Sequence, residues 1–384
     1  MKGCADLPSG PLQGNFASLQ CLRGLAALLV VLVHAAILVQ SDRGFWPLPD
    51  FVRAGAMGVD LFFCISGFIM YHTSAEGFAV PGATGRFLRR RFLRIYPPYW
   101  IVFGLTLLAG WLLPAYVLPT LELTPAYLTK SFLLLPQDLT PLVQQSWTLV
   151  HEIRFYALFG LSLALPRKQA VRALVAWGVG SLVLLVLSYV EAMPWPHSLV
   201  GRILNYVFHP NSLEFLLGVV AAAIVRHVRT SAATDLKILS AGLILALAAL
   251  FGFTSLAFET KYRVLTVFML PSFLLILGGT LWERRAPRKL PRLLIGLGNA
   301  SYAIYLTHRL FMEFAIPRFF YSAANRQAVV AQTWVVVVLA LIVGWIFHRI
   351  VERPLHGLAR RWARPKSAGP SPRSAVAIPK TVTN

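Results

Sequence analysis

Near its start, the sequence reads Arg23-Gly24-Leu25-Ala26-Ala27-Leu28-Leu29-Val30-Val31-Leu32-Val33-His34. This apolar stretch has an arginine at its beginning and a histidine at its end. At about 100° per residue, the interval between them is three turns plus roughly 20°, so both side chains lie on one face of a helix. The rise of about 1.5 Å per residue separates them by roughly 16 Å along the axis. The stretch predicts a membrane-spanning helix with an arginine near one surface and a histidine near the middle.

Ionisable side chains at such depth are costly to bury, so Arg23 and His34 are candidate functional residues. Each also has a structural interpretation. Arg23 could be an anchor whose charge snorkels to the membrane surface. His34 could be a core histidine that bonds a backbone carbonyl.

The composition supports a membrane protein. Of 384 residues, 57% are hydrophobic and 13% are charged, whereas soluble proteins carry about 25% charged residues. The mean hydropathy is +0.64. The net charge of +21 could suggest nucleic-acid binding, but the positive residues cluster between apolar segments, which is typical of cytoplasmic loops. We therefore expect an all-α polytopic membrane protein with no nucleic-acid partner.

Ten membrane spans are predicted, at residues 22–40, 55–72, 95–113, 147–165, 171–190, 201–225, 237–256, 263–282, 294–315 and 329–351. The loops after even-numbered spans contain more than twice as many Lys and Arg residues as the other loops. The positive-inside rule then predicts that both termini are cytoplasmic. We expect a cytoplasmic segment at 1–15, a membrane domain at 16–357, and a disordered basic cytoplasmic tail at 358–384, which is rich in Pro, Ser and Ala.

The cysteines and loops exclude some classes of site. The three cysteines, Cys4, Cys21 and Cys64, lack metal-ligand spacing, so we expect neither a disulfide framework nor a zinc site, and no metal. The loop at 114–146 contains five prolines, and loops of this length tend to be functional or interfacial.

The second span contains the run Gly58-Val59-Asp60-Leu61-Phe62-Phe63-Cys64-Ile65-Ser66-Gly67-Phe68. It is predicted to enter from the outer side, which puts Asp60 in the outer third and Ser66 deeper. Asp60 could orient the imidazole of His34 and raise its basicity. Alternatively, backbone amides at the start of the helix could satisfy the carboxylate.

A basic run, Arg89-Arg90-Arg91-Phe92-Leu93-Arg94, precedes the third span. Arg91 and Arg94 are three residues apart, so they share one helix face. Guanidinium groups suit phosphate oxygens. A basic run beside a membrane can also set the topology or contact anionic lipid.

The fourth span opens with Ser146-Trp147-Thr148-Leu149-Val150-His151-Glu152-Ile153-Arg154-Phe155-Tyr156. Three ionisable side chains in one entering turn are unusual for a span. Glu152 and Tyr156 lie on one face, and Trp147 also fits an interfacial aromatic belt. The roles of His151, Arg154 and the buried-span carboxylate Glu214 stay open.

The ninth span contains Gly298-Asn299-Ala300-Ser301-Tyr302-Ala303-Ile304-Tyr305-Leu306-Thr307-His308. Ser301, Tyr305 and His308 form one stripe, and His308 is predicted to lie at a depth similar to that of His34. Such a stripe can also simply hold helices together.

Together these motifs resemble the membrane-bound acyltransferase family 3, whose members O-acylate O-antigens, exopolysaccharides, nodulation factors and macrolides. The run Val351-Glu352-Arg353-Pro354 resembles the family's ending after the last span. The resemblance covers nearly all of 15–357. It implies a multi-pass enzyme of the bacterial inner membrane, an acyl-coenzyme A donor on the cytoplasmic side, and a saccharide or glycolipid acceptor outside. It also implies functional roles for Arg23, His34, Arg91 and Arg94.

The residue chemistry agrees with this resemblance. A thioester is already activated, so no permanently bound cofactor is expected, and acyl-coenzyme A is a co-substrate. His34 could take a proton from the acceptor hydroxyl or carry the acyl group itself; the sequence leaves this open, along with the acyl group, the acceptor and the oligomeric state. The candidate catalytic residues are His34, Asp60 and Glu152, and the candidate donor-binding residues are Arg23, Arg91 and Arg94. Further candidates are Ser66, Trp147, Tyr156, Ser301, Tyr302 and His308.

Two other classes of protein fit buried charges in a helical bundle. A transporter or flippase of a lipid-linked saccharide would normally show a repeat, and the sequence shows none. A lipid-binding or scaffold protein would use the charges only to hold helices together. Neither class requires an acyl donor, which distinguishes both from a transferase.

Overall fold

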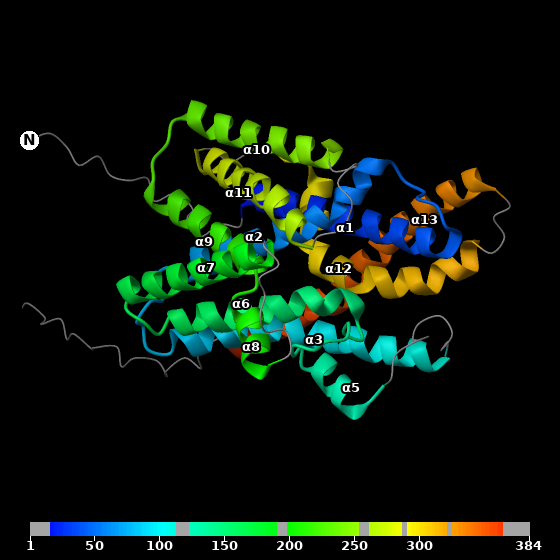
Figure 1. Ribbon diagram of the computed structural model, residues 1–384, viewed down its shortest axis with the longest axis horizontal. Helices are drawn as coiled ribbons and strands as arrows, with labels where there is room; N and C mark the ends of the chain where they lie inside the picture. Colours follow the sequence, from blue (N-terminus) through cyan, green and yellow to red (C-terminus); the bar gives the residue numbers. More distant parts are fainter. Residues whose placement is uncertain are drawn as a thin grey trace, which may run out of the picture.

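The computed structural model describes residues 16–112, 123–189, 198–252, 261–285, 290–320 and 325–363, and every regular element in these ranges is a helix (Figure 1). The long helices are α1 (Ala17–Arg43), α2 (Met57–Ser74), α3 (Ala83–Leu112), α6 (Trp147–Ser162), α7 (Arg167–Tyr189), α9 (Asn211–His227), α10 (Ala232–Gly252), α11 (Lys261–Arg285), α12 (Arg292–Phe320) and α13 (Arg326–Phe347). Shorter elements are η1 (Asp50–Ala56), α5 (Pro125–Phe132), η2 (Gln144–Ser146), α8 (Leu199–Val207), η3 (His348–Glu352) and α14 (Arg353–Ala363).

The prediction of an all-α polytopic membrane protein is confirmed. Within the described ranges, 8 helical segments are long and apolar enough to cross a membrane. The two remaining predicted spans, 147–165 and 294–315, correspond to α6 and α12. With 16 residues, α6 is short for a bilayer that needs about 20, whereas α12 has 29 residues but contains His308, Arg309 and Glu313. The count of ten spans and the cytoplasmic termini stay predictions.

Helices α1 and α12 pack along one another at the centre of the bundle (Figure 1). A Cβ atom on Gly298 would lie 1.9 Å from the Gln20 carbonyl oxygen, and one on Gly24 would lie 2.5 Å from the Leu294 oxygen. Only glycine permits such a close approach of two backbones. This contact fixes the register of the two helices, so that side chains further along them meet.

The long loop folds back onto α3. Residues 113–122 lie outside the described part, but 123–146 contain α5 and η2. Tyr96, Tyr99 and Trp100 of α3 donate to carbonyl oxygens of Leu133, Ser131 and Phe132, at 2.9, 2.5 and 3.1 Å. These bonds anchor the loop beside the bundle.

The chain leaves α13 through η3, a single π-helical turn, and continues as α14. Helix α14 packs against α3 and runs to Ala363, so helical structure extends beyond the predicted tail boundary at 357. Residues 1–15 and 364–384 lie outside the described part of the chain, and the predictions for them stay untested.

Candidate active site

The two histidines of α1 and α12 lie side by side. The His34 Nδ1 atom is 2.9 Å from the Val30 oxygen and 3.2 Å from His308 Nε2. The His308 Nδ1 atom is 3.0 Å from the Ile304 oxygen. His308 is fully buried, whereas His34 is partly exposed. The sequence placed the two residues at similar depth, and the structure brings their rings to a centroid distance of 5.0 Å.

The carbonyl partners determine the tautomers of this pair. A carbonyl oxygen can only accept, so each Nδ1 that faces one must bear a hydrogen. His308 Nε2 is then an acceptor, and the His34 Nδ1–H is shared between the Val30 oxygen and His308 Nε2. The Nε2 atom of His34 is left with its lone pair. His34 is therefore arranged as a base at Nε2.

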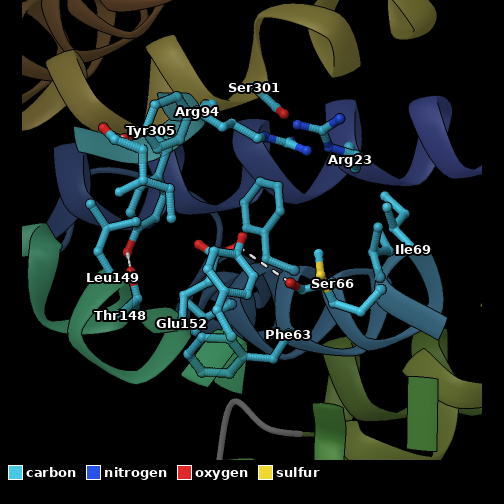
Figure 2. A pocket seen from close by; sticks show the side chains of 17 residues that line it. Arg23, Phe63, Ser66, Ile69, Arg94, Thr148, Leu149, Glu152, Ser301 and Tyr305 are labelled. Carbon is cyan, nitrogen blue, oxygen red and sulfur yellow. Dashed lines mark hydrogen bonds between the residues drawn. The ribbon is translucent and has the colours of Figure 1, made fainter. Parts of the chain in front are cut away.

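A narrow cavity of about 80 Å³ lies between α1, α2, α3, α6 and α12 (Figure 2). Seven of the predicted site residues line it, namely Arg23, Ser66, Arg94, Glu152, Tyr156, Ser301 and Tyr302. They come from five helices that are far apart in sequence. The structure thus brings most of the candidate residues into one place.

Glu152 is the carboxylate of this cavity. Its Oε1 atom accepts hydrogen bonds from the Ser66 hydroxyl, at 3.3 Å, and from the Tyr156 hydroxyl. It also lies within electrostatic reach of Arg23 and Arg94. Two hydroxyl donors and two arginines thus surround the Glu152 carboxyl group.

Two arginines face each other in the same cavity. Figure 2 shows the guanidinium groups of Arg23 and Arg94 pointing toward one another beside the hydroxyl of Ser301. Glu352, which is buried and bonded to His348 at 2.6 Å, lies within electrostatic reach of both. Two converging guanidinium groups form an arrangement that suits a phosphate or carboxylate group.

The four arginines before the third span divide into two pairs. Arg89 and Arg90 are exposed, whereas Arg91 and Arg94 are partly buried. Arg94 lines the cavity. The Arg91 guanidinium lies over the Phe87 and Tyr156 rings, at 5.3 and 5.6 Å from their centroids, and therefore contributes to the wall behind the cavity.

Tyr305 separates the cavity from the histidine pair. Its ring lies 5.8 Å from the rings of both Phe62 and His308. Its hydroxyl is 2.7 Å from the Thr148 hydroxyl and donates to the Gln145 oxygen at 3.0 Å. His34 and His308 do not line the cavity. Tyr305 therefore contacts both parts of the site. We call the narrow cavity the ionic compartment, and His34 with His308 the histidine compartment.

The predicted partnership between Asp60 and His34 is not found. Asp60 is buried beside the Glu214 carboxyl group of α9, because α2 packs against α9. The partner that Glu214 lacked in the sequence analysis is thus Asp60, and His34 has His308 instead.

Three residues of α6 lie outside the cavity. Trp147 is 37% exposed, which fits an interfacial side chain as well as a site residue. The ring of His151 lies 4.5 Å from that of His209. Arg154 is buried against the rings of Phe155 and Tyr206 and donates to the Tyr206 oxygen. Their functional roles stay open.

Glu352 is the site residue that the sequence analysis did not select. The motif that contains it was recognised, but only as the ending of the membrane part. The spacing of His348 and Glu352, four residues apart, could have indicated a paired carboxylate. Among the described residues, no group of three or more His, Cys, Asp and Glu side chains is placed to hold a metal ion.

Comparisons with known proteins identify the family of this chain. The family model described as "Acyltransferase domain" (Acyl_transf_3) matches residues 16–349. The acyltransferase MdmB of Streptomyces mycarofaciens is 28% identical, over 92% of this chain and 95% of that protein. The exopolysaccharide production protein ExoZ of Rhizobium meliloti is 31% identical, over 84% of this chain and 95% of that protein. No solved structure matches this chain. The predicted family is confirmed: this chain belongs to the family 3 acyltransferases and is a multi-pass membrane acyltransferase.

Proposed function

We propose that the protein moves an acyl group, in the simplest case acetyl, from cytoplasmic acyl-coenzyme A to a hydroxyl group of an extracytoplasmic saccharide or glycolipid. The observation that carries this proposal is the arrangement of His34. Its Nδ1–H is held by the Val30 oxygen and His308 Nε2, which leaves Nε2 free to act as a base. Arg23 lies about 16 Å away on the same helix face, toward the predicted cytoplasmic side.

The proposed reaction uses both compartments of the site. The His34 Nε2 atom takes the proton from the acceptor hydroxyl while the hydroxyl oxygen attacks the thioester carbonyl carbon. The tetrahedral intermediate collapses as the carbon–sulfur bond breaks, and the imidazolium returns the proton to the leaving thiolate. The products are the ester and coenzyme A. If His34 instead attacks the thioester directly, the same Nε2 atom carries the acyl group in a relay.

His308 is a positioning residue in this scheme. When His34 gains a proton at Nε2, its Nδ1–H becomes a charge-assisted donor to His308 Nε2 and the Val30 oxygen. The His308 Nδ1–H donates to the Ile304 oxygen, which keeps His308 Nε2 available as an acceptor. The pair therefore fixes the tautomer of His34 and stabilises the imidazolium that forms.

The arginines are proposed to bind the donor. Arg23 and Arg94 point toward one another at the cavity, and coenzyme A brings phosphate groups from the cytoplasmic side. Arg91 would support this site through its contact with the Tyr156 ring. Glu152 would hold Ser66 and Tyr156 in place and offset part of the positive charge of the arginines.

The relatives and the apolar helices support the proposed acceptor and location. The name of the exopolysaccharide production protein ExoZ supports a saccharide acceptor, and the multiple apolar helices support a multi-pass protein of the bacterial inner membrane. Membrane lipids would surround the bundle. The acyl donor is consumed in the reaction, so no cofactor need stay bound.

Transfer of radiolabelled acetyl from acetyl-coenzyme A to surface glycan, in inside-out membrane vesicles, tests the proposal. Vesicles that contain the wild-type protein should label the glycan, and mass analysis should identify the modified sugar. Vesicles with His34→Gln should not label it. His227→Gln is the matched control, because His227 contacts Arg167, away from both compartments. Labelling that does not depend on the protein, or saccharide movement without any donor, would contradict the proposal and favour a flippase.

A further inference from the structure

A second cavity lies where α12, α13, η3 and α14 meet. It encloses about 540 Å³ and is open to the surface. Its polar and aromatic lining consists of Asn299, Trp345, His348, Arg349, Arg353 and His356. We call this cavity the basic groove. None of its lining residues belongs to the narrow cavity described above.

The carboxylate of the π-helical turn does not pair with the two arginines of the basic groove. Arg349 and Arg353 are both exposed. Glu352, the carboxylate between them in sequence, turns inward and bonds His348 at 2.6 Å. The Arg349 guanidinium instead lies 4.6 Å from the centroid of the Trp345 ring. The groove therefore presents two guanidinium groups and an aromatic face to whatever enters it.

The basic groove and the narrow cavity are adjacent. Glu352 lies within electrostatic reach of Arg23 and Arg94, which line the cavity. Along α12, Asn299 lines the groove, and Tyr302, three residues later on the same side of the helix, lines the cavity. His308 follows Asn299 at about 13–14 Å along the helix axis. An elongated ligand that begins in the groove would pass through the cavity toward the histidine pair.

The sizes of the two spaces differ in a way that matters for the donor. The narrow cavity, about 80 Å³, is far smaller than the roughly 300–1,000 Å³ that enclose a drug-sized ligand. The basic groove, at about 540 Å³, lies within that range. The cavity thus suits a thin chain, and the groove suits a bulky anionic head.

We propose that the basic groove binds the adenine nucleotide end of the acyl donor, with Arg349 and Arg353 on its phosphate groups and the Trp345 ring beside the adenine. This inference rests on the proposed function for the identity of the donor. Arginine forks bind phosphate in bidentate geometry, and aromatic faces bind nucleobases through stacking. Arg23 and Arg94 then bind the remaining phosphate groups of the donor, as in the proposed function, and the pantetheine arm runs on along α12.

Binding measurements on purified protein in phosphatidylcholine nanodiscs test this assignment without requiring turnover. The probes are coenzyme A and pantetheine, which lacks the nucleotide. For Arg349→Gln/Arg353→Gln, the Kd for coenzyme A should rise about 10-fold or more, because phosphate contacts to arginine are lost. The affinity for pantetheine and the Tm should stay at their wild-type values. Arg89→Gln/Arg90→Gln is the matched control, because it removes two exposed arginines outside the groove, and it should change neither affinity.

Several results would overturn the assignment. These are absence of coenzyme A binding by the wild-type protein, an unchanged Kd in the groove variant, or an equal loss in the Arg89/Arg90 control. The wild-type protein and the groove variant should also be compared in phosphatidylglycerol and phosphatidylcholine nanodiscs. If the groove variant binds coenzyme A normally but no longer incorporates preferentially into phosphatidylglycerol, the occupant is an anionic lipid headgroup. If coenzyme A binding falls as expected while the wild-type protein transfers no acyl group, the groove assignment holds and the proposed function fails.

Discussion

The two compartments of the site are built from the same pair of helices but differ in their chemistry. At one end of α1 and α12, Arg23 and Ser301 face a cavity with Arg94 and Glu152. About two to three turns further along, the Nδ1 atoms of His34 and His308 face backbone carbonyl oxygens, and His308 Nε2 faces His34 Nδ1. One compartment contains charged side chains, and the other contains two imidazole rings that face backbone oxygens. Under the proposed function, donor binding and proton transfer are therefore separated along one helix pair.

Burial explains this separation. A charge inside a membrane bundle is tolerated where an opposite charge or several donors accompany it. Arg23 and Arg94 have Glu152 and Glu352 within electrostatic reach. A neutral imidazole pair needs only hydrogen bonds, and the Val30 and Ile304 oxygens supply them.

The largest effect should come from His34. Replacement by alanine removes the base, so we expect kcat to fall by about 10²–10⁴-fold, measured as acyl transfer in membrane vesicles. His34→Gln keeps a polar side chain without a base and should be equally inactive. Membrane insertion and Tm should match those of the wild-type protein. If His34→Ala retains near-normal transfer, the histidine compartment does not perform the chemistry.

Arg94→Lys should have the next largest effect, and on a different kinetic constant. Lysine keeps the charge but loses the planar fork. A lost charge-assisted contact costs about 1.5–3 kcal/mol, which is roughly 10- to 150-fold in affinity. The KM for the donor should rise by this factor, and the KM for the acceptor should not change. Arg91→Lys should have a smaller effect, because Arg91 lies behind the cavity wall.

Arg90→Lys is the control for this experiment, because Arg90 is exposed. If Arg90, Arg91 and Arg94 respond alike, the arginines serve the membrane surface rather than the donor. A change in the acceptor KM alone would mean that these arginines bind the acceptor and not the donor.

The contrast between these compartments also shows what the sequence can predict. The apolar stretch of 23–34 predicts both the helix and the common face of Arg23 and His34, because these depend on local periodicity alone. The stripe from Ser301 to His308 follows from the same rule. The contact between His34 and His308 does not, because it depends on the close approach of α1 and α12 at Gly24 and Gly298.

The two failures of the sequence analysis have the same physical origin. Periodicity places Asp60 on one face of its helix but does not say which neighbouring helix that face meets. Glu214, its neighbour, lies on α9, which is distant in sequence and packs against α2. Glu352 is buried because the chain makes a π-helical turn after α13, and no spacing rule predicts such a turn.

Replacement of His308 should lower kcat moderately, and two different replacements can distinguish a positioning role from a catalytic one. His308→Ala removes the acceptor for the His34 Nδ1–H, so kcat should fall by about 10-fold, which corresponds to roughly 1.4 kcal/mol, with both KM values unchanged. His308→Gln places a side-chain carbonyl near the same N–H and should recover most of kcat. If glutamine is as inactive as alanine, the role of His308 is not that of an acceptor.

Asp60→Asn should have the smallest effect, and it decides whether the acid pair belongs to the catalytic chemistry. In the structure Asp60 lies beside Glu214 and does not contact His34. An asparagine amide can donate to the Glu214 carboxyl group, so the variant keeps a polar contact at this position. Acyl transfer should therefore stay near the wild-type rate.

Asp60→Ala leaves Glu214 without this partner and should lower the free energy of unfolding by about 1–3 kcal/mol, read as a lower Tm. A loss of transfer in Asp60→Asn as severe as that in His34→Ala, at an unchanged Tm, would mean that the acid pair delivers or removes the proton. The reaction would then use a third compartment, on α2 and α9, in addition to the two on α1 and α12.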